Sequence, residues 1–302
     1  MATRLTADII KDYAVFWLQE FSAHKEQNIN IFPELTVKKT TKARVGDSVS
    51  VKIPRIIPTM QDWSPSTDRP MEDKLPPFTH EIEIERKGIG SEYNEEDLVD
   101  DILGTRNDMQ AFAREARAYV PTLAMKMIGA GAATTYGTCF DGKALFANDH
   151  NYGSQALDNY FAGTNLDADG LGEALAHFSG IRDEHGEVMG IKPTYLMYHP
   201  ALNKAALTAL NATMISNTSN VFQNALIPVE NPYFTNAKDW AVIASRKPNT
   251  AVIAYIEKSF TQNPQSDEIT TMFMRETVKF GAKVEYGLGY MDFRLALGLQ
   301  TT

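Results

Sequence analysis

The sequence predicts an α+β protein, because it carries strand and helix patterns in separate segments. Residues 48–53 and 80–86 alternate polar and apolar side chains, with the period of two that a half-buried strand shows. From Met109 to Met127, apolar residues recur at the i, i+3, i+4, i+7 spacing of an amphipathic helix. Both patterns in one chain are typical of the α+β class.

Composition excludes two classes of protein and leaves many open. The chain has 302 residues, of which 43% are hydrophobic, enough for a substantial core in one large or two modest domains. No apolar run approaches the roughly 20 residues that span a bilayer, so no membrane partner is expected. A net charge of −9 disfavours a surface that grips nucleic acid through Lys and Arg.

An amphipathic arm is predicted at the start of the chain. Residues 4–27 place bulky apolar side chains at partly helical spacing, Phe16 and Trp17 among them. Such a face needs a cover, so we expect both residues to contact another subunit. The arm and the segment that follows it make up residues 1–44.

A proline-dense segment, 54–78, joins the two predicted strands and is far longer than an ordinary hairpin turn. We expect residues 45–92 to form one extended hairpin loop. Its apolar residues favour a partner on another subunit, although a loop folded back on its own domain stays open. The expected contacts to that partner are Met60, Trp63, Arg69 and Phe78.

The predicted long helix covers about 107–128. Asn107 is its expected N-cap, Pro121 should bend it, and Gly129 should end it. The acidic residues before it, between Glu92 and Asp101, suit a solvated helix start better than a metal site, because adjacent carboxylates point to different faces.

The remainder alternates short elements. Residues 140–153 are rich in turn formers, and two strands at the C-terminus are expected to join at Gly287 and Gly289. The predicted helices are 166–182 and 201–210, and the predicted strands are 194–198, 240–244, 251–256, 272–286 and 291–299.

Catalytic chemistry finds little support. A site built on Asp149 and His150, with Ser154 or Cys139 as nucleophile, is the sharpest enzymatic hypothesis. The chain lacks a nucleophile elbow, a P-loop and a dinucleotide fingerprint after a strand. Cys139, the only cysteine, is expected to be a small buried residue. We therefore predict no catalytic, cofactor-binding or metal-binding residues.

Five segments, taken in order, resemble capsid subunits with the Hong Kong 97-type fold, and among them most nearly the Mu-like phage major head subunit family. Each segment is loose by itself, and their shared order carries the resemblance. They are 58–63 (PTMQDW), 97–104 (DLVDDILG), 140–150 (FDGKALFANDH), 190–200 (GIKPTYLMYHP) and 280–289 (FGAKVEYGLG).

The resemblance implies the major capsid protein of a tailed phage, assembled in the bacterial cytoplasm and located in the virion. It implies a hairpin loop lying over a neighbour, a peripheral domain at 93–185 with the long spine helix, an axial domain at 186–270, and return strands of the peripheral domain at 271–302. The implied partners are copies of the chain in hexamers and pentamers, a portal, and decoration proteins. DNA is enclosed without sequence-specific binding. Since the arm begins almost at Met1, a separate scaffolding protein is expected.

Two alternatives stay open at this point. An encapsulin-like nanocompartment shell would share the fold but enclose protein, and a soluble α/β hydrolytic enzyme would use Asp149 and His150. Some relatives of the resembled family form a lysine–asparagine cross-link, and Lys74 is placed where such a lysine might lie, but no matching asparagine or acid catalyst is identified.

Overall fold

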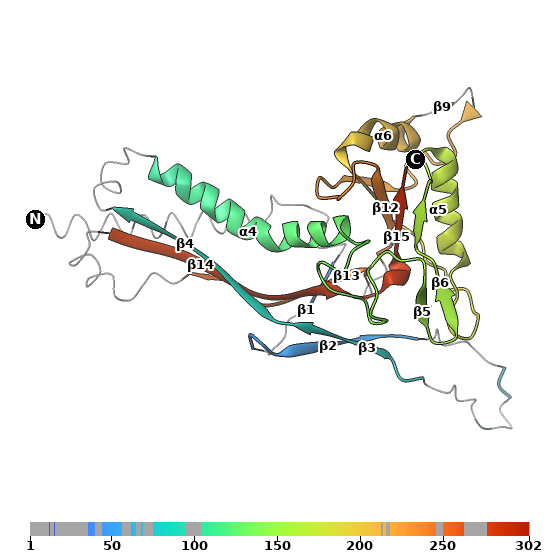
Figure 1. The fold of residues 1–302 in the computed structure, drawn as a ribbon, viewed down its shortest axis with the longest axis horizontal. Coiled ribbons are helices and arrows are strands. Elements are labelled where there is room, and N and C mark those ends of the chain that lie inside the picture. Colours follow the sequence, from blue (N-terminus) through green and yellow to red (C-terminus); the bar gives the residue numbers. More distant parts are fainter. Residues whose placement is uncertain are drawn as a thin grey trace, which may run out of the picture.

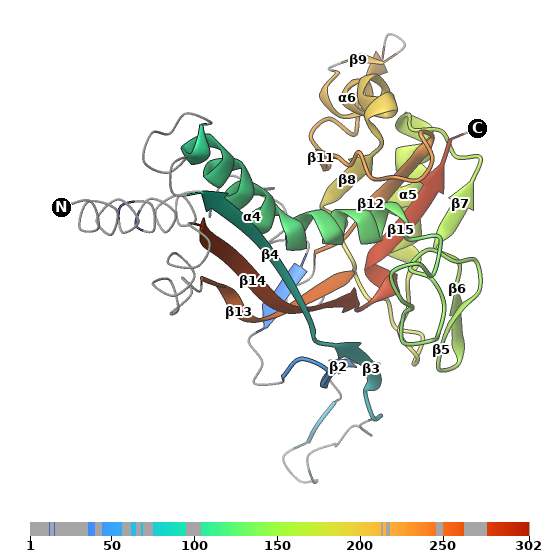
Figure 2. The ribbon, with the colours of Figure 1, turned by 60° about the vertical axis from the view of Figure 1, so that its left-hand side comes forward.

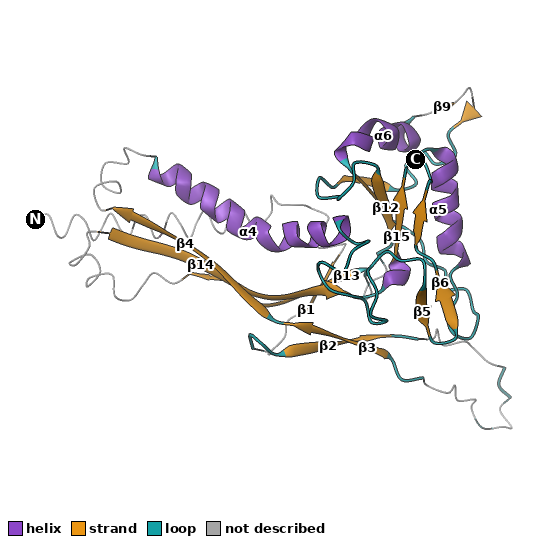
Figure 3. Cartoon of the chain, in the orientation of Figure 1, coloured by secondary structure: helices purple, strands orange, loops and turns teal. Residues whose placement is uncertain are grey.

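The structure is a computed structural model that describes residues 12, 15, 36–39, 44–55, 62–64, 68, 75–94, 104–212, 214–215, 218–245, 250–262 and 277–301. Two sheets lie at opposite ends of the molecule, and a hairpin projects beside them (Figure 1). Each sheet and the helices packed on it form one lobe, the first around the four-stranded sheet and the second around the five-stranded sheet. Helices and strands occur together in both lobes (Figure 3), which confirms the predicted α+β class.

The first sheet has four strands in the order β1-β13-β14-β4. Two ion pairs tie its outer strand β4 to β14 between residues directly opposite each other: Arg86 with Glu285 at 2.6 Å and Lys279 with Glu92 at 3.5 Å. Cross-strand pairs of opposite charge favour this register over a slipped one. The strands are β1 (Thr36–Lys39), β4 (Glu85–Asn94), β13 (Val252–Gln262) and β14 (Thr277–Tyr290).

Helix α4 (Thr105–Gly129) lies along this sheet (Figure 2). Its buried residues follow the predicted periodicity: Met109, Ala113, Ala116, Val120 and Ala124. The helix changes direction along its length, as Pro121 inside it predicts.

The predicted N-cap of α4 was wrong. The cap is Gly104, in the left-handed region at φ 69°, and no side chain caps the helix. Asn107 lies inside the first turn, where its N–H donates to the Gly104 carbonyl at 2.8 Å. Glycine adopts this left-handed conformation readily, so the helix begins at Thr105, before the predicted cap Asn107.

The far end of α4 is anchored between the two lobes. It stops at Gly129, as predicted, where an added Cβ would lie 2.3 Å from the Tyr233 carbonyl oxygen. Asn231 donates to the Met125 carbonyl at 3.0 Å and Tyr290 to the Met127 carbonyl at 2.8 Å. These bonds satisfy helix carbonyls near the C-terminus, within the core.

The second sheet has five strands in the order β11-β8-β12-β15-β7. Helix α5 starts with an Asp167 side chain that accepts from the Gly170 N–H at 2.9 Å, and its residues Leu171, Ala174 and Phe178 are buried in the core. Only α5, α6, β8, β12 and β15 were predicted among the elements of this lobe. The elements are β7 (Tyr160–Ala162), β8 (Tyr195–Tyr198), β11 (Ile227–Glu230), β12 (Asp239–Ile243), β15 (Ala296–Gln300), α5 (Ala168–Gly180) and α6 (Asn203–Asn211), with short elements β5 (His150–Tyr152), β6 (Gln155–Leu157), η1 (Pro200–Leu202), β9 (Met214–Ile215), β10 (Thr218–Ser219) and η2 (Phe293–Leu295).

The two strands predicted on either side of the proline-dense segment pair as a hairpin, but residues 85–92 of the predicted 45–92 loop belong to β4 in the first sheet. Strands β2 (Ser48–Ile53) and β3 (Phe78–Glu83) pair antiparallel, with Ile53 opposite Phe78 at the end that leads into residues 54–77. On one face Val51, Ile53, Ile82 and Ile84 form a small buried cluster with Met291. Burial on one side only accounts for the alternating sequence pattern.

Gly287 and Gly289 do not form the predicted turn. Strand β14 runs through both, and the chain turns only after Tyr290. An added Cβ would lie 2.8 Å from the Ile84 Cδ1 at Gly287 and 2.7 Å from the Ile82 Cδ1 at Gly289. The glycines therefore let the hairpin pack closely on β14, which is a second reason for glycine within a strand.

The two sheets cut across the predicted domain boundaries. Strand β13 falls within 186–270 but pairs with β1 and β14, whereas β15 falls within 271–302 and pairs with β12 and β7. The chain thus passes from the first sheet to the second, goes back to the first with β13 and β14, and ends in the second with β15.

Two further sequence predictions meet the structure only in part. Glu92 lies in β4, so the predicted helix start does not include it, and residues 95–101 lie outside the described residues. Among the helices that the structure describes, none is long and apolar enough to cross a membrane.

Replacing Gly289 by Ala should lower the free energy of unfolding by about 1–3 kcal/mol, because the new methyl group overlaps buried Ile82. Urea unfolding of the unassembled chain measures this cost. Gly281→Ala in the same strand is the control, since its Cβ would meet only the Ile89 carbonyl at an ordinary 3.5 Å. Equal effects of the two variants would contradict the close approach of the hairpin.

Candidate functional site at the root of the hairpin

The hairpin is joined to the body of the molecule by a column of stacked rings. The ring centroids of Phe78 and Phe140 lie 4.6 Å apart, those of Phe140 and Phe293 4.9 Å, and those of Phe293 and His150 3.9 Å. Arg55 places its guanidinium 4.7 Å from the Phe78 centroid. This ring column, Phe78, Phe140, Phe293 and His150, links β3 to the 140–150 turn and to η2.

Two arginines reinforce the same junction. Arg55 forms a bidentate pair with Glu184, with both nitrogen–oxygen distances at 2.7 Å, and the Glu184 side chain is only 6% exposed. Arg294 is fully buried, pairs with Asp292 at 2.9 Å, and donates to the Pro54 carbonyl at 3.0 Å. Ion pairs and stacked rings therefore hold the start and the end of the loop in one place.

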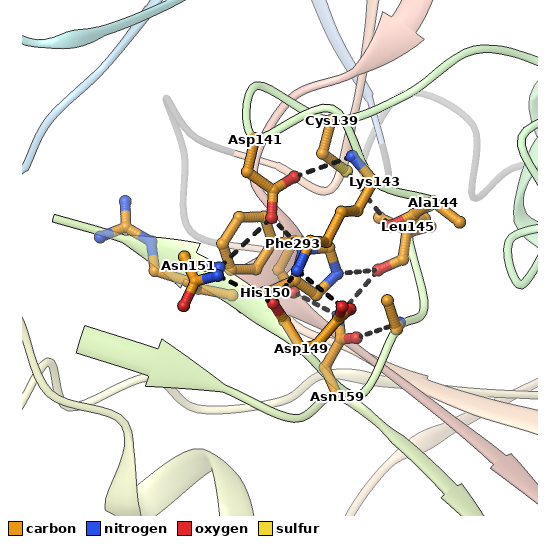
Figure 4. Close-up of polar contacts among 12 residues, drawn as sticks. Cys139, Asp141, Lys143, Ala144, Leu145, Asp149, His150, Asn151, Asn159 and Phe293 are labelled. Atoms are coloured by element: carbon orange, nitrogen blue, oxygen red, sulfur yellow. Dashed lines mark hydrogen bonds and ion pairs between the residues drawn. The ribbon is translucent and has the colours of Figure 1, made fainter. Parts of the chain in front are cut away.

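His150 is the inner end of the column and has no exposed surface. Its Nδ1 lies 2.6 Å from Asp141 Oδ2 and its Nε2 lies 3.2 Å from the Leu145 carbonyl oxygen, while the ring lies flat on Phe293 (Figure 4). A carboxylate and a carbonyl both accept, so an imidazole with two N–H groups satisfies both. The 141–150 turn is thereby fastened to the core.

This arrangement favours the ionised form of the Asp141 carboxyl group. Burial works to raise its pKa, but the hydrogen bond to His150 and the charge of that ring outweigh it, with help from the backbone N–H groups of Lys143 and Asn151. The pKa of Asp141 therefore lies below its ordinary value. The ionised carboxylate is the form that the fold stabilises.

The geometry does not support the alternative of a hydrolytic site on Asp149 and His150. The Asp149 side chain is 72% exposed and pairs with Lys143 at 2.8 Å, and the carboxylate that binds His150 is Asp141. Both nitrogens of the buried imidazole have protein partners, so the ring is not presented to a substrate.

The two side chains considered as nucleophiles, Cys139 and Ser154, do not lie in a catalytic arrangement. Cys139 is buried, as predicted, and burial raises the pKa of its thiol, which keeps it protonated. Ser154 directs its hydroxyl to the Glu184 carbonyl at 3.5 Å. Among the residues that the structure describes, no group of three or more His, Cys, Asp or Glu could hold a metal ion.

Of the six residues expected to contact another subunit, the structure describes only Trp63 and Phe78. Phe16, Trp17, Met60 and Arg69 lie outside the described residues. Trp63 is 50% exposed, and its contact with another subunit stays a prediction.

Phe78 differs from that expectation, since its ring belongs to the column within its own subunit. Sequence reasoning did not identify Arg55, Phe140, Glu184 or Phe293 as members of this site. Their partners are distant in sequence, and no local pattern marks them.

Replacing Phe140 by Ala should lower the free energy of unfolding by about 3 kcal/mol, because it removes the middle ring of the column. Amide hydrogen exchange should quicken more in β2 and β3 than in α6, which lies at the end of the molecule away from the hairpin (Figures 1 and 2). Phe140→Leu, which keeps most of the volume, is the matched variant and should cost less. Uniform acceleration across all strands would show a general loss of stability instead of a loosened root.

Replacing Asp141 by Asn should cost about 1–3 kcal/mol at pH 7, the usual loss for a hydrogen bond to a charged group. The folded state lowers the pKa of Asp141, so its contribution is fully present above the ordinary value of 3.8 and is lost as the pH falls through the folded-state value. Urea unfolding from pH 7 to 3 should show the difference between the two proteins closing in acid. Exposed Asp158→Asn is the control, and a difference that does not narrow at all between pH 7 and pH 3 would refute the bond between an ionised Asp141 and His150.

Comparison with protein families finds one match, to the family described as phage capsid protein, over residues 78–297. Comparison with curated proteins finds none.

Solved structures with the same fold include three shell proteins. The bacteriophage JBD30 capsid has a TM-score of 0.52 and 13% identity over 91% of this chain, which spans 65% of the length of that protein. The capsid of cyanophage P-SCSP1u has a TM-score of 0.57 and 13% identity, covering 91% of this chain and 89% of that one. A virus-like particle from Pyrococcus furiosus has a TM-score of 0.56 and 12% identity, covering 95% and 99%.

At these identities the structural matches establish a shared capsid fold, whereas the family match extends over most of the sequence, from β3 through to β15. Both comparisons are consistent with the burial of His150 and Cys139 in the core. The chain belongs to the phage capsid protein family.

Proposed function

We propose that this major capsid protein of a phage tiles a closed icosahedral shell around DNA, and that each copy reaches over a neighbour with the β2–β3 hairpin and the segment 54–77 that joins its strands. The observation that carries the proposal is the ring column, because it holds the hairpin firmly at its root. A hairpin that is rigidly attached to its own subunit presents its far end to a neighbour in a defined position.

Exposed apolar side chains on the hairpin support a partner beyond the subunit. Trp63 is 50% exposed, Val45 40% and Leu75 36%. Burial of such side chains on assembly contributes roughly 25 cal/mol for each Å² removed from water. Each contact is modest, and a closed shell repeats it in every copy.

The lobes suit the division that the Hong Kong 97-type fold implies. Helix α4 and the four-stranded sheet correspond to the peripheral domain with its spine helix, and the five-stranded sheet with α5 and α6 corresponds to the axial domain. On this assignment the second lobe meets its copies at the centres of hexamers and pentamers. Within this fold, the sequence resembles the Mu-like head subunit family.

The assembly needs other phage proteins in this proposal. A separate scaffolding protein, a portal and decoration proteins are the expected partners, and assembly takes place in the bacterial cytoplasm before the protein resides in the virion. A net charge of −9 suits a wall that encloses DNA without holding it.

The same proposal makes the chain a structural protein without enzymatic activity. Support comes from the buried, fully engaged His150 and from the family match. An encapsulin-like compartment shares the shell architecture, but the match to phage capsid proteins over residues 78–297 favours the phage.

Replacing residues 58–75 by a two-residue turn should leave a folded subunit that closes no shells. The deletion spares Arg55 and Phe78, which the structure places in the root, and β2 and β3 keep their register. Electron microscopy of the chain expressed with its own scaffold measures closed particles, and urea unfolding measures the fold.

Trp63→Ser is the smaller, matched change and should reduce particle yield without altering subunit stability, because half of this side chain is exposed. Normal particles from the deletion would refute the hairpin assignment. A full chain that stays monomeric with its scaffold would refute the proposed function.

A further inference from the structure

A cavity of about 440 Å³ lies beside helix α4, where the hairpin joins the first sheet. Four parts of the chain form it: the junction of β3 and β4, the C-terminal half of α4, the turn at 135–137, and strand β14. Helix α4 runs alongside β4 and β14 in both views (Figures 1 and 2). The volume falls within the range of ordinary ligand sites, roughly 300–1,000 Å³. The rings of the ring column do not line this cavity, so their role does not account for it.

Much of the lining is apolar or aromatic. The apolar side chains are Leu123, Met127 and Leu288. Three phenol rings join them, from Tyr119, Tyr136 and Tyr286, and the first and last of these meet edge to face with their centroids 5.7 Å apart. Apolar surface packs against an aliphatic stem, and phenol rings attract a cation through their quadrupole.

Two of the phenol groups are hydrogen-bonded toward a carboxylate. The Tyr286 hydroxyl donates to Glu85 Oε2 at 3.3 Å, and the Tyr119 hydroxyl lies 3.3 Å from the Tyr286 hydroxyl. Because Tyr286 donates its only proton to Glu85, Tyr119 is the donor in the second bond. Burial, together with the neighbouring Tyr119 and Glu85, raises the pKa of Tyr286 and keeps that phenol protonated. Both phenol protons are therefore already used, and this side of the cavity offers acceptor oxygens to a ligand.

Negative charge exceeds positive charge in the lining. Glu83 and Glu85 carry two negative charges, and Lys87 carries one positive charge. Lys87 Nζ lies 3.3 Å from Glu85 Oε2, but the two side chains are 52% and 53% exposed, so water weakens this pair. Among the residues that the structure describes, Glu83 forms no ion pair. The cavity can therefore accept a further positive charge.

The lining selects among the possible classes of ligand. An anion would meet two carboxylates, and a metal ion lacks ligands, because the described residues contain no group of three or more His, Cys, Asp or Glu that could hold one. A ligand with a positive head and an apolar stem satisfies both the carboxylates and the apolar side chains.

We propose that this cavity binds an alkylammonium group, carried either by a free aliphatic amine or by a lysine side chain of another protein. The ammonium group lies against Glu83 and Glu85, and the stem packs on Leu123 and Met127. The bound group connects the β3–β4 junction to α4, and so fixes the angle at which the hairpin leaves the first sheet. The inference goes beyond the proposed shell function and does not depend on it.

The test is an NMR titration of the full, unassembled chain with n-butylamine in about 0.1 M salt. Saturable binding with a dissociation constant of about 1 mM or lower is expected. n-Butanol has the same stem without the charge, and ammonium chloride has the charge without the stem, so each should bind at least about tenfold more weakly. In about 1 M salt the affinity for n-butylamine should fall, because the carboxylates near the surface are screened.

Glu83→Gln keeps the size of the side chain and removes its charge, so the affinity for n-butylamine should fall at least about fivefold. Glu81→Gln is the matched control, because Glu81 is also exposed on β3 but does not line the cavity, and it should change the affinity less than about twofold.

A capped Gly-Lys-Gly peptide distinguishes the two sources of the group. Tighter binding of the peptide than of n-butylamine supports a lysine side chain of a partner, and the reverse order supports a free amine. No saturable binding of either probe, equal binding of n-butanol, or equal losses from Glu83→Gln and Glu81→Gln would overturn the inference. None of these results bears on the shell function, which fails only if the chain forms no closed particles with its scaffold.

Discussion

The ring column at the hairpin root is the interaction on which the architecture depends. It brings together Phe78 from the hairpin, Phe140 and His150 from the central turn, and Phe293 from the C-terminal segment. These residues come from three distant parts of the sequence, and each ring packs against the next at 3.9–4.9 Å. A chain that passes repeatedly between two sheets needs such a junction, because neither sheet alone fixes where the hairpin points.

Charge reinforces this junction in a way that packing alone would not. The Arg55–Glu184 and Arg294–Asp292 pairs are largely withdrawn from water, and the Arg294–Pro54 contact ties one of them to the loop backbone. Buried pairs of this kind add little net stability, but removing one partner strands the other. Their effect is to make one orientation of the root much better than its alternatives, which is the requirement for a subunit that must fit many identical neighbours.

Local patterns in the sequence predicted the elements well and their association poorly. Alternation identified β2 and β3, and helical spacing identified α4 and α5, because both depend on a single buried face. Gly287 and Gly289 were misread as a turn, since their reason is the close approach of Ile82 and Ile84 from far away in the chain. The same limit applies to the site: Asp149-His150 is conspicuous in sequence, but the carboxylate that matters, Asp141, is chosen by the fold of the turn.

The contacts inside the subunit differ in kind from the exposed apolar side chains that the proposed shell would bury. Inside the subunit, aromatic stacking, bidentate pairing and burial act together on a few residues, so the root resists rearrangement. On the outside, the exposed apolar side chains of the described residues lie on different elements, for example Trp63 in the hairpin loop and Val221 on the second lobe. Strong external patches would join the first copies that met, in whatever geometry they met. Weak contacts displayed on rigid supports are satisfied together only in the closed shell, so geometry does the selecting and the number of copies supplies the stability.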